Sequence, residues 1–256
     1  MSKKGVRAIF RKDLLQKNCS DPFLGVIKRA MRLFLIALLS LPALALAQDD
    51  PSLFGAGLYS RPKFDGSADR RIELIPFISY YGSPWFARTT QGVLEGGARW
   101  NPGGGLNLGV QVAYESGPLD HDPGASIGAH AEWERNIGPA PVIGLLRLRQ
   151  HLDSDRGLQL DARATVGVYE GHGLAAGVFA QATWASEKYF QAYYGLHDSG
   201  LLFTSLGALG AYDLARRWQL IGSLEHRRLA DDAAKSPIVV RRSGAYASLG
   251  LAYLFK

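Results

Sequence analysis

The chain has 256 residues and a formal net charge of +6. Residues 1–47 hold nine of the 29 basic residues and two of the 23 acidic ones, which leaves 20 against 21 in residues 48–256. A near-neutral remainder without a basic stripe excludes nucleic-acid binding as the expected function. The only cysteine, Cys19, lies in the first segment, so the remainder needs no disulfide.

A secretory signal peptide is predicted over residues 1–47. The run LFLIALLSLPALAL at 33–46 carries no charge, follows a basic segment and ends in an Ala-x-Ala site. It is shorter than the ~20 residues that a membrane-spanning helix needs. We expect cleavage between Ala47 and Gln48. Met31 begins a complete signal by itself and is an alternative start of the chain.

Residues 48–256 are predicted to form one all-β domain. Apolar residues recur at every second position, and turn clusters such as NPGG and DSDRG arrive every ten to fifteen residues. The segment WFARTTQGVLEGGARW at 85–100 is compatible with one bulged strand or two short ones, so we expect ten to twelve strands. The predicted strands are centred near residues 56, 75, 96, 110, 131, 147, 164, 179, 193, 208, 222 and 250.

The last strand, GAYASLGLAYLFK, alternates cleanly and carries aromatic residues at Tyr253 and Phe255. A strand at a chain end usually frays, whereas closing a barrel requires the last strand to pair with the first. Such a strand also resembles the signal that the insertion machinery of Gram-negative outer membranes recognises. It departs from that pattern because Lys256 follows the aromatic residue.

Two architectures share this alternation: a soluble barrel with its apolar face inward and a membrane barrel with that face outward. The signal peptide, the strand lengths near the 9–11 residues of a tilted membrane strand, and aromatic residues near turns favour the second. We therefore predict an antiparallel transmembrane β-barrel in contact with outer-membrane lipid. The predicted aromatic girdle comprises Trp100, Tyr114, Trp133, Tyr169, Trp184, Tyr189, Trp218 and Phe255.

The polar face is predicted to line a wet lumen with a ladder of charges. Pairing Ile137 with Val142 across the GPAP turn would set Glu132 opposite Arg147. The same register would set His130 opposite Arg149. Across the DSDRG turn, Asp161 would face Arg149 and Arg163 would face Arg147. The predicted lumenal network consists of His130, Glu132, Arg147, Arg149, Asp161 and Arg163.

The polar face that lines the predicted lumen is open to two interpretations, a catalytic one and a packed, structural one. His130, His151, Glu132 and Asp161 could form an acid–base cluster like those of barrel proteases and lipid hydrolases. The nearest serines, Ser126 and Ser154, do not lie in a recognisable triad context. His121, between two aspartates, lacks a partner at ligand spacing. We predict no catalytic, metal or cofactor site.

The C-terminal third resembles a known family. The segment KYFQAYYGL and the stretch from RRWQLIGSLEHRRL to the end resemble the MltA-interacting protein (MipA) and outer-membrane protein V (OmpV) family, as does GAGLYSRPKFDGSADRRIELIPFISYY near the start. Relatives carry a longer segment where this chain has residues 197–204. The distinctive loop, Leu229–Arg242, contains Asp231, Asp232, Ser236, Pro237, Arg241 and Arg242.

The resemblance implies an outer-membrane barrel of a Gram-negative bacterium. The named member of the family is a scaffold that joins a murein lytic transglycosylase to a bifunctional peptidoglycan synthase; other members are described as surface antigens or adhesins. The leading hypothesis is thus a non-enzymatic scaffold for peptidoglycan remodelling that binds through periplasmic turns. The alternatives are a small channel for polar solutes and, third, a barrel hydrolase.

Overall fold

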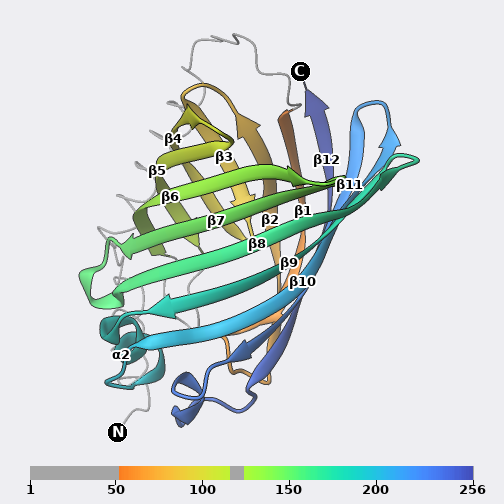
Figure 1. The fold of residues 1–256 in the computed structure, drawn as a ribbon. Helices are drawn as coiled ribbons and strands as arrows, with labels where there is room; N and C mark the ends of the chain where they lie inside the picture. The colour runs from red at the N-terminus through yellow and green to blue at the C-terminus, as the bar shows by residue number, and fades with distance from the viewer. Residues whose placement is uncertain (1–51, 116–123, 256) are drawn as a thin grey trace, which may run out of the picture. The chain divides into compact units, whose positions relative to one another are not determined.

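The structure is a computed structural model that describes residues 52–115 and 124–255. These residues form a closed antiparallel barrel of twelve strands (Figure 1), which confirms the predicted fold class. The expected signal peptide at 1–47, its cleavage site, His121 and Lys256 lie outside the described residues.

Each strand pairs with its neighbours in the chain, and the last strand pairs with the first. The first six strands are β1 (Ser52–Pro62), β2 (Arg70–Tyr81), β3 (Trp85–Thr90), β4 (Val93–Gly103), β5 (Leu106–Glu115) and β6 (Gly124–Ile137). The remaining six are β7 (Ala140–His151), β8 (Leu158–Gly171), β9 (Leu174–Ala185), β10 (Gly200–Ala215), β11 (Trp218–Leu229) and β12 (Ser243–Phe255).

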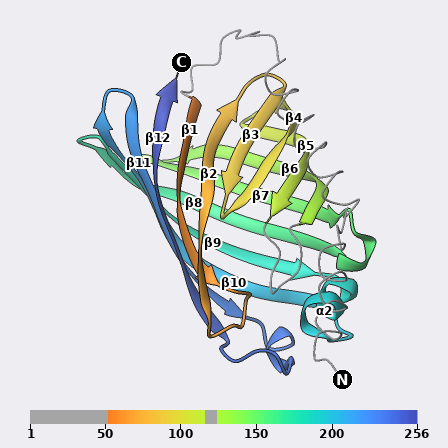
Figure 2. The same cartoon turned by 180° about the vertical axis from the view of Figure 1, so that it is seen from behind.

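The closing pair behaves as the sequence predicts. β1 and β12 lie side by side in both views (Figures 1 and 2), and Ser52 pairs with Phe255 at the chain ends of the two strands. In β12, Tyr246 and Ala252 are buried inside the barrel, while Leu249, Leu251 and Phe255 are exposed on its outer wall. The alternating terminal strand is therefore needed to close the wall.

The two ends of the barrel differ in the length of their connections. One end, called here the short-turn end, carries the two-residue turns at 104–105, 138–139, 172–173 and 216–217, together with the start of β1 and the end of β12. The opposite end, called the long-loop end, carries the connections at 63–69, 152–157, 186–199 and 230–242. Two short 3-10 helices, η1 (Ser154–Arg156) and η2 (Ala233–Lys235), lie in the long loops.

The strand predicted near residue 193 is wrong, because this segment forms a helix, α2 (Glu187–Tyr194). Its buried residues Phe190, Tyr193 and Tyr194 follow the i, i+3, i+4 spacing of one helical face. Gly195 ends the helix in a left-handed conformation, φ 65°. None of the helices in the described ranges is long and apolar enough to cross a membrane.

The ambiguous segment 85–100 forms two strands, so the number of strands remains twelve. β3 and β4 are joined by Gln91 and Gly92, both with positive φ (53° and 82°), as a tight two-residue hairpin requires. β3 is short and pairs with β2 at only three positions. The hairpin turn therefore ends beside the middle of β2, at the level of the lumenal side chains.

The outer wall carries the apolar face. Leu74 and Leu206 expose 76% and 68% of their surface, values that suit contact with hydrocarbon and not with water. Tyr189, assigned to the aromatic girdle by the sequence, instead lies on α2 with its ring against Tyr193. The other girdle residues are exposed on the wall as predicted: Trp100, Tyr114, Trp133, Tyr169, Trp184, Trp218 and Phe255.

Candidate functional site in the lumen

The lumenal network exists, but its predicted register is wrong by two residues. Ile137 pairs with Ala140 and not with Val142, because Gly138, at φ 61°, makes a two-residue turn with Pro139. His130 is consequently opposite Arg147. Across the next turn, Arg147 and not Arg149 is opposite Asp161.

Asp161 is the centre of the network. Its carboxylate accepts hydrogen bonds from Arg147 Nε at 2.9 Å, Arg149 Nη2 at 3.2 Å and Thr183 Oγ1 at 2.8 Å. The residue is 1% exposed. A buried carboxylate is tolerated only when it is paired and hydrogen-bonded in this way.

Four further residues extend the network into a chain of alternating charge. Arg147 Nη1 contacts Glu95, which also accepts a bond from Arg88 at 3.3 Å. Arg88 Nη1 then donates to Glu132 at 2.7 Å. At the other end, Arg149 donates to Glu115 at 3.1 Å. The order is Glu132, Arg88, Glu95, Arg147, Asp161, Arg149 and Glu115.

These ion pairs cross the lumen, since Arg88 on β3 reaches β6 and Arg147 on β7 reaches β4. Sequence reasoning missed Arg88 and Glu95 because it left open whether segment 85–100 forms one bulged strand or two short ones. The sequence feature that could have revealed Arg88 and Glu95 is the Gln91-Gly92 pair. As a two-residue hairpin turn, it places Arg88 directly opposite Glu95.

Two predicted members of the network have other partners. His130 Nδ1 lies 2.5 Å from the Gln111 side-chain oxygen, and its ring contacts the edge of Phe86. Arg163 forms no ion pair within the described ranges; its guanidinium stacks over Phe179, 3.8 Å from the ring centroid. Both residues therefore pack inside the barrel without joining the chain of ion pairs.

A second cluster joins loop 63–69 to β11 and β12. Arg227 on β11 bonds Glu225 at 2.7 Å and Asp65 at 3.5 Å, and its guanidinium lies over the Tyr246 ring at 4.1 Å. The Tyr246 hydroxyl donates to Asp65. Gln91, in the β3–β4 turn, donates to Glu225 at 2.9 Å. This turn therefore folds into the lumen and contacts β11 across it.

Helix α2 covers the lumen at the long-loop end. Phe190 is fully buried in an apolar cluster with residues of β10, β11 and η2. Tyr189 and Tyr193 face His151, with ring centroids 6.1 and 6.4 Å away. Burial raises the pKa of Tyr193 to about 12 and that of Tyr189 well above its usual range, so both phenols stay neutral at physiological pH.

The loop at residues 229–242, called here the family loop, completes the cover that α2 forms at the long-loop end. Ser236 donates to the Tyr194 carbonyl oxygen at 2.5 Å, and Arg241 N–H donates to Gly66 O at 3.0 Å. Arg242 pairs with Asp231, and Lys235 with Asp232 at 2.6 Å. Pro237 is exposed. Residues 200–204 of the shortened segment already belong to β10, which leaves 195–199 as the link from α2.

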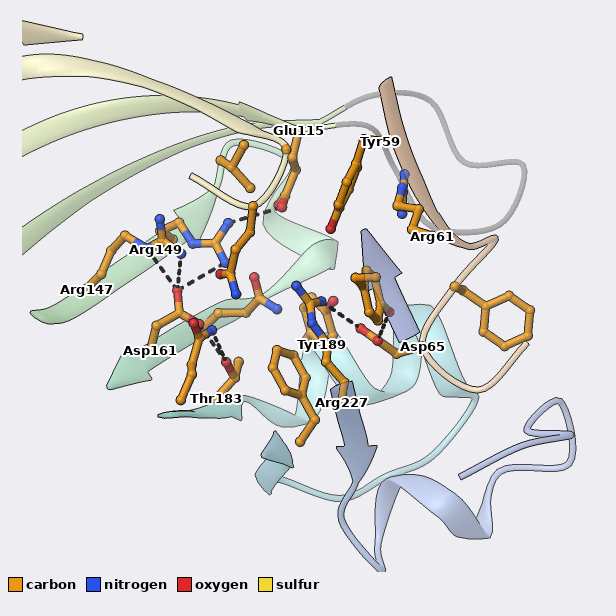
Figure 3. A pocket seen from close by; sticks show the side chains of 18 of the residues that line it. Tyr59, Arg61, Asp65, Glu115, Arg147, Arg149, Asp161, Thr183, Tyr189 and Arg227 are labelled. Carbon is orange, nitrogen blue, oxygen red and sulfur yellow. Dashed lines mark hydrogen bonds and ion pairs between the residues drawn. The ribbon is translucent and has the colours of Figure 1, made fainter. Parts of the chain in front are cut away.

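Between the two clusters lies a cavity of about 100 Å³ (Figure 3). Four arginines and four carboxylates line it, so its formal charge balances; they are Arg61, Arg147, Arg149, Arg227, Asp65, Glu73, Glu115 and Asp161. Figure 3 shows Arg149 and Arg147 directed at Asp161 on one side and Arg227 at Asp65 on the other. The space suits a few water molecules.

The nearest approach to a hydrolytic triad is Ser126, His151 and Glu115. His151 Nε2 lies 3.4 Å from Glu115, and Ser126 pairs with His151 across the strands. Ser126 Oγ forms no hydrogen bond to any described residue, whereas a nucleophile must reach its base. In the ranges that the structure covers, no three metal-ligating side chains come together.

Comparisons with known proteins identify a family and solved structures with a similar fold. The family model described as MltA-interacting protein MipA matches residues 54–255. Among curated proteins, no match was found. An outer-membrane channel from Pseudomonas putida F1 is 11% identical, covers 84% of this chain and 100% of its own, and gives a TM-score of 0.51.

Two further solved structures are the NanC porin and the translocator domain of the autotransporter NalP from Neisseria meningitidis. The first is 12% identical, covers 78% of this chain and 98% of its own, and has a TM-score of 0.49. The second is 11% identical, covers 90% and 96%, and has a TM-score of 0.47. At such identities the likeness to the Pseudomonas channel shows the fold alone.

Proposed function

Because this chain belongs to the MltA-interacting protein (MipA) family, we propose that it is a non-enzymatic scaffold or accessory protein for peptidoglycan synthesis and remodelling. Its barrel is that of an outer-membrane protein. The proposed partners are a murein lytic transglycosylase, which the family name indicates, and a bifunctional peptidoglycan synthase. An exported precursor with a signal peptide at 1–47 is part of the proposal.

The main support is the way in which side chains cross the lumen. Arg88, Glu95 and Arg147 connect β3, β4, β6 and β7, and Gln91 reaches β11 from the other side. With α2 above them, these contacts leave a cavity of about 100 Å³, and a solute pathway would need far more space. Binding is therefore assigned to the ends of the barrel and not to its interior.

The short-turn end is the surface proposed to bind the partners. In bacterial barrels, short turns face the periplasm and longer loops face the exterior, and peptidoglycan lies in the periplasm. The turns carry exposed charges of both signs, among them Glu170 and Arg216. By the same rule, the family loop at 229–242 faces the exterior and secures α2, so its role is proposed to be structural.

Capture of purified partners tests the proposal. The protein is purified from outer membranes in mild detergent, immobilised, and exposed to a purified lytic transglycosylase of the MltA type, with an unrelated barrel as control. We expect specific retention by the wild type. Reversing the turn charges, Glu170→Lys with Arg216→Glu, should weaken it about tenfold, equivalent to about 1.4 kcal/mol.

A matched variant at the long-loop end, Asp232→Lys, should bind like the wild type. Failure of the wild type to retain the transglycosylase, or loss of binding only in Asp232→Lys, would contradict the proposal. Planar-bilayer recording addresses the channel alternative: a steady conductance from the wild type would contradict the closed interior. Replacement of Glu132 by Gln should leave partner binding unchanged.

A further inference from the structure

The outer wall contains a groove that the lumenal site does not use. It has a volume of about 1010 Å³ and is lined mainly by outward-facing residues of β5 to β11. Strands β7 to β10, which form most of it, cross the front of the barrel in Figure 1. On a wall that faces hydrocarbon, a groove of this size must be filled by something apolar.

The floor of the groove consists of small residues in two hydrogen-bonded rows. In one row, Gly144 pairs with Ala164 and Ala164 with Ala180. In the other, Ala162 pairs with Ala182 and Ala182 with Thr204, whereas in the first row the larger Leu206 follows Ala180. The two rows are adjacent on the same face, because their members differ by two positions along each strand.

Larger side chains stand on both sides of this floor. On the side of the long-loop end, a neighbouring row contains Leu148, Leu160 and Trp184. On the side of the short-turn end, a row contains Val142, Val166 and Val178. The small floor between two bulky rows gives the groove its depth and its direction across the strands.

The groove has a length that suits an acyl chain. From Gly144 on β7 to His226 on β11 it crosses four strand spacings, about 19 Å at 4.8 Å each. One leaflet of the hydrocarbon core is about 15 Å thick. A groove that runs obliquely over this distance therefore matches a lipid chain within a single leaflet.

Two basic side chains mark one end of the groove. His226 and Arg228 line it on β11, are exposed on the outer wall, and form no ion pair with any described residue. Arg228 is adjacent to the end of β11, which places it at the long-loop boundary. A cation at that depth costs little, about 0–1 kcal/mol, and attracts an anionic headgroup.

We propose that this groove binds a phosphorylated outer-leaflet glycolipid, the lipid A part of lipopolysaccharide. One acyl chain lies over Gly144, Ala164 and Ala180, and a phosphate group contacts Arg228 and His226. Charge complementarity selects the phosphate, because the Arg228 guanidinium donates charge-assisted hydrogen bonds to its oxygens and the His226 ring can donate another. The proposal depends on the same orientation of the barrel as the proposed function and not on its protein partners.

Binding of defined lipids tests the proposal. Purified protein in detergent is titrated with lipid A that carries both phosphates and with the same lipid after the phosphates are removed, and bound lipid is counted by native mass spectrometry. We expect the wild type to prefer the phosphorylated lipid about tenfold. Arg228→Gln with His226→Gln should remove that preference, whereas Ala164→Leu with Ala180→Leu should reduce binding of both lipids.

The matched control is Arg135→Gln, which removes an exposed wall arginine at the short-turn end of β6. It should bind both lipids like the wild type, and all variants should retain the heat-dependent gel migration of a folded barrel. Equal binding of the two lipids by the wild type would overturn the proposal. So would unchanged binding in the groove-filled variant, or an equal loss in Arg135→Gln, which would indicate general charge attraction.

Discussion

The two halves of the lumen are built differently. In the half toward the long loops, charged side chains from six strands meet, and aromatic rings of α2 cover them. In the half toward the short turns, glycines lie in the wall and aromatic rings pack against them. A Cβ on Gly250 would come within 2.3 Å of the Phe77 ring, and one on Gly207 within 2.3 Å of Phe179.

The difference shows two ways in which side chains can fill the interior of one barrel. Long charged side chains reach partners three strands away, so they connect distant parts of the wall and fix its cross-section. Rings that lie on glycine fill space locally and contact strands that are at most two positions apart in the barrel, as Phe77 on β2 does with Gly250 on β12. The first half should therefore carry most of the stability of the interior, and four substitutions test this in order of expected effect.

The largest effect is expected for Asp161→Ala. This change leaves Arg147 and Arg149 as buried charges without their shared carboxylate. Breaking a buried pair in this way costs about 3–5 kcal/mol of the free energy of unfolding. Urea unfolding of the purified barrel, followed by tryptophan fluorescence, measures it; a loss below about 1 kcal/mol would show that the network contributes little.

A comparable loss is expected for Phe190→Ala in α2. The ring is fully buried, so its removal leaves a cavity in the cover and costs about 3–5 kcal/mol locally. Limited proteolysis of residues 186–199 should become faster while the strands stay protected. The exposed neighbour Gln191, changed to Ala, provides the control and should leave the cleavage rate unchanged.

A smaller loss, about 1–3 kcal/mol, is expected for Gly250→Ala in the short-turn half. The added methyl would overlap Phe77, and also the Ala56 carbonyl oxygen at 2.8 Å. Shortening the ring in the double variant Gly250→Ala/Phe77→Leu should restore part of the stability. A double-mutant cycle without coupling would show that the ring and the glycine do not pack as described.

The smallest effect is expected for Ser223→Ala, which removes the hydrogen bond of 2.7 Å to Ser248. One neutral bond contributes about 0.5–1.5 kcal/mol. The free energy of unfolding of Ser223→Ala, measured under the same urea conditions as that of Asp161→Ala, provides the reference for the larger loss expected there. A loss as large as that of Asp161→Ala would mean that the two halves are equally important for stability.

The sequence predicted the wall better than the interior. Alternation in β5 and β12 depends only on which solvent each face meets, so the outward residues, Tyr253 and Phe255 included, were assigned correctly. The register of β6 and β7 depends on the conformation of Gly138, and an error of one turn type there set Arg147 opposite Glu132 instead of His130. Contacts such as Arg88 with Glu132 depend on the curvature of the closed wall, which no local pattern encodes.

The helix at 187–194 shows a different limit. Its aromatic residues suit a strand by propensity, and the surrounding segments alternate. Only the spacing of Phe190, Tyr193 and Tyr194, with Gly195 after them, indicates a helix. The sequence predicts a strand here because the segments on both sides alternate as barrel strands do.

Because β12 closes on β1, the finished barrel does not depend on which strand comes first in the chain, as long as the cyclic order of the strands is kept. Because Ser52 and Phe255 are neighbours, a short linker between them and new termini at the 138–139 turn would give a circular permutant with every pairing preserved. Such a chain would still contain the β12 strand but no longer end in it. Refolding in detergent without insertion in cells would then separate the structural role of this strand from a role as an address.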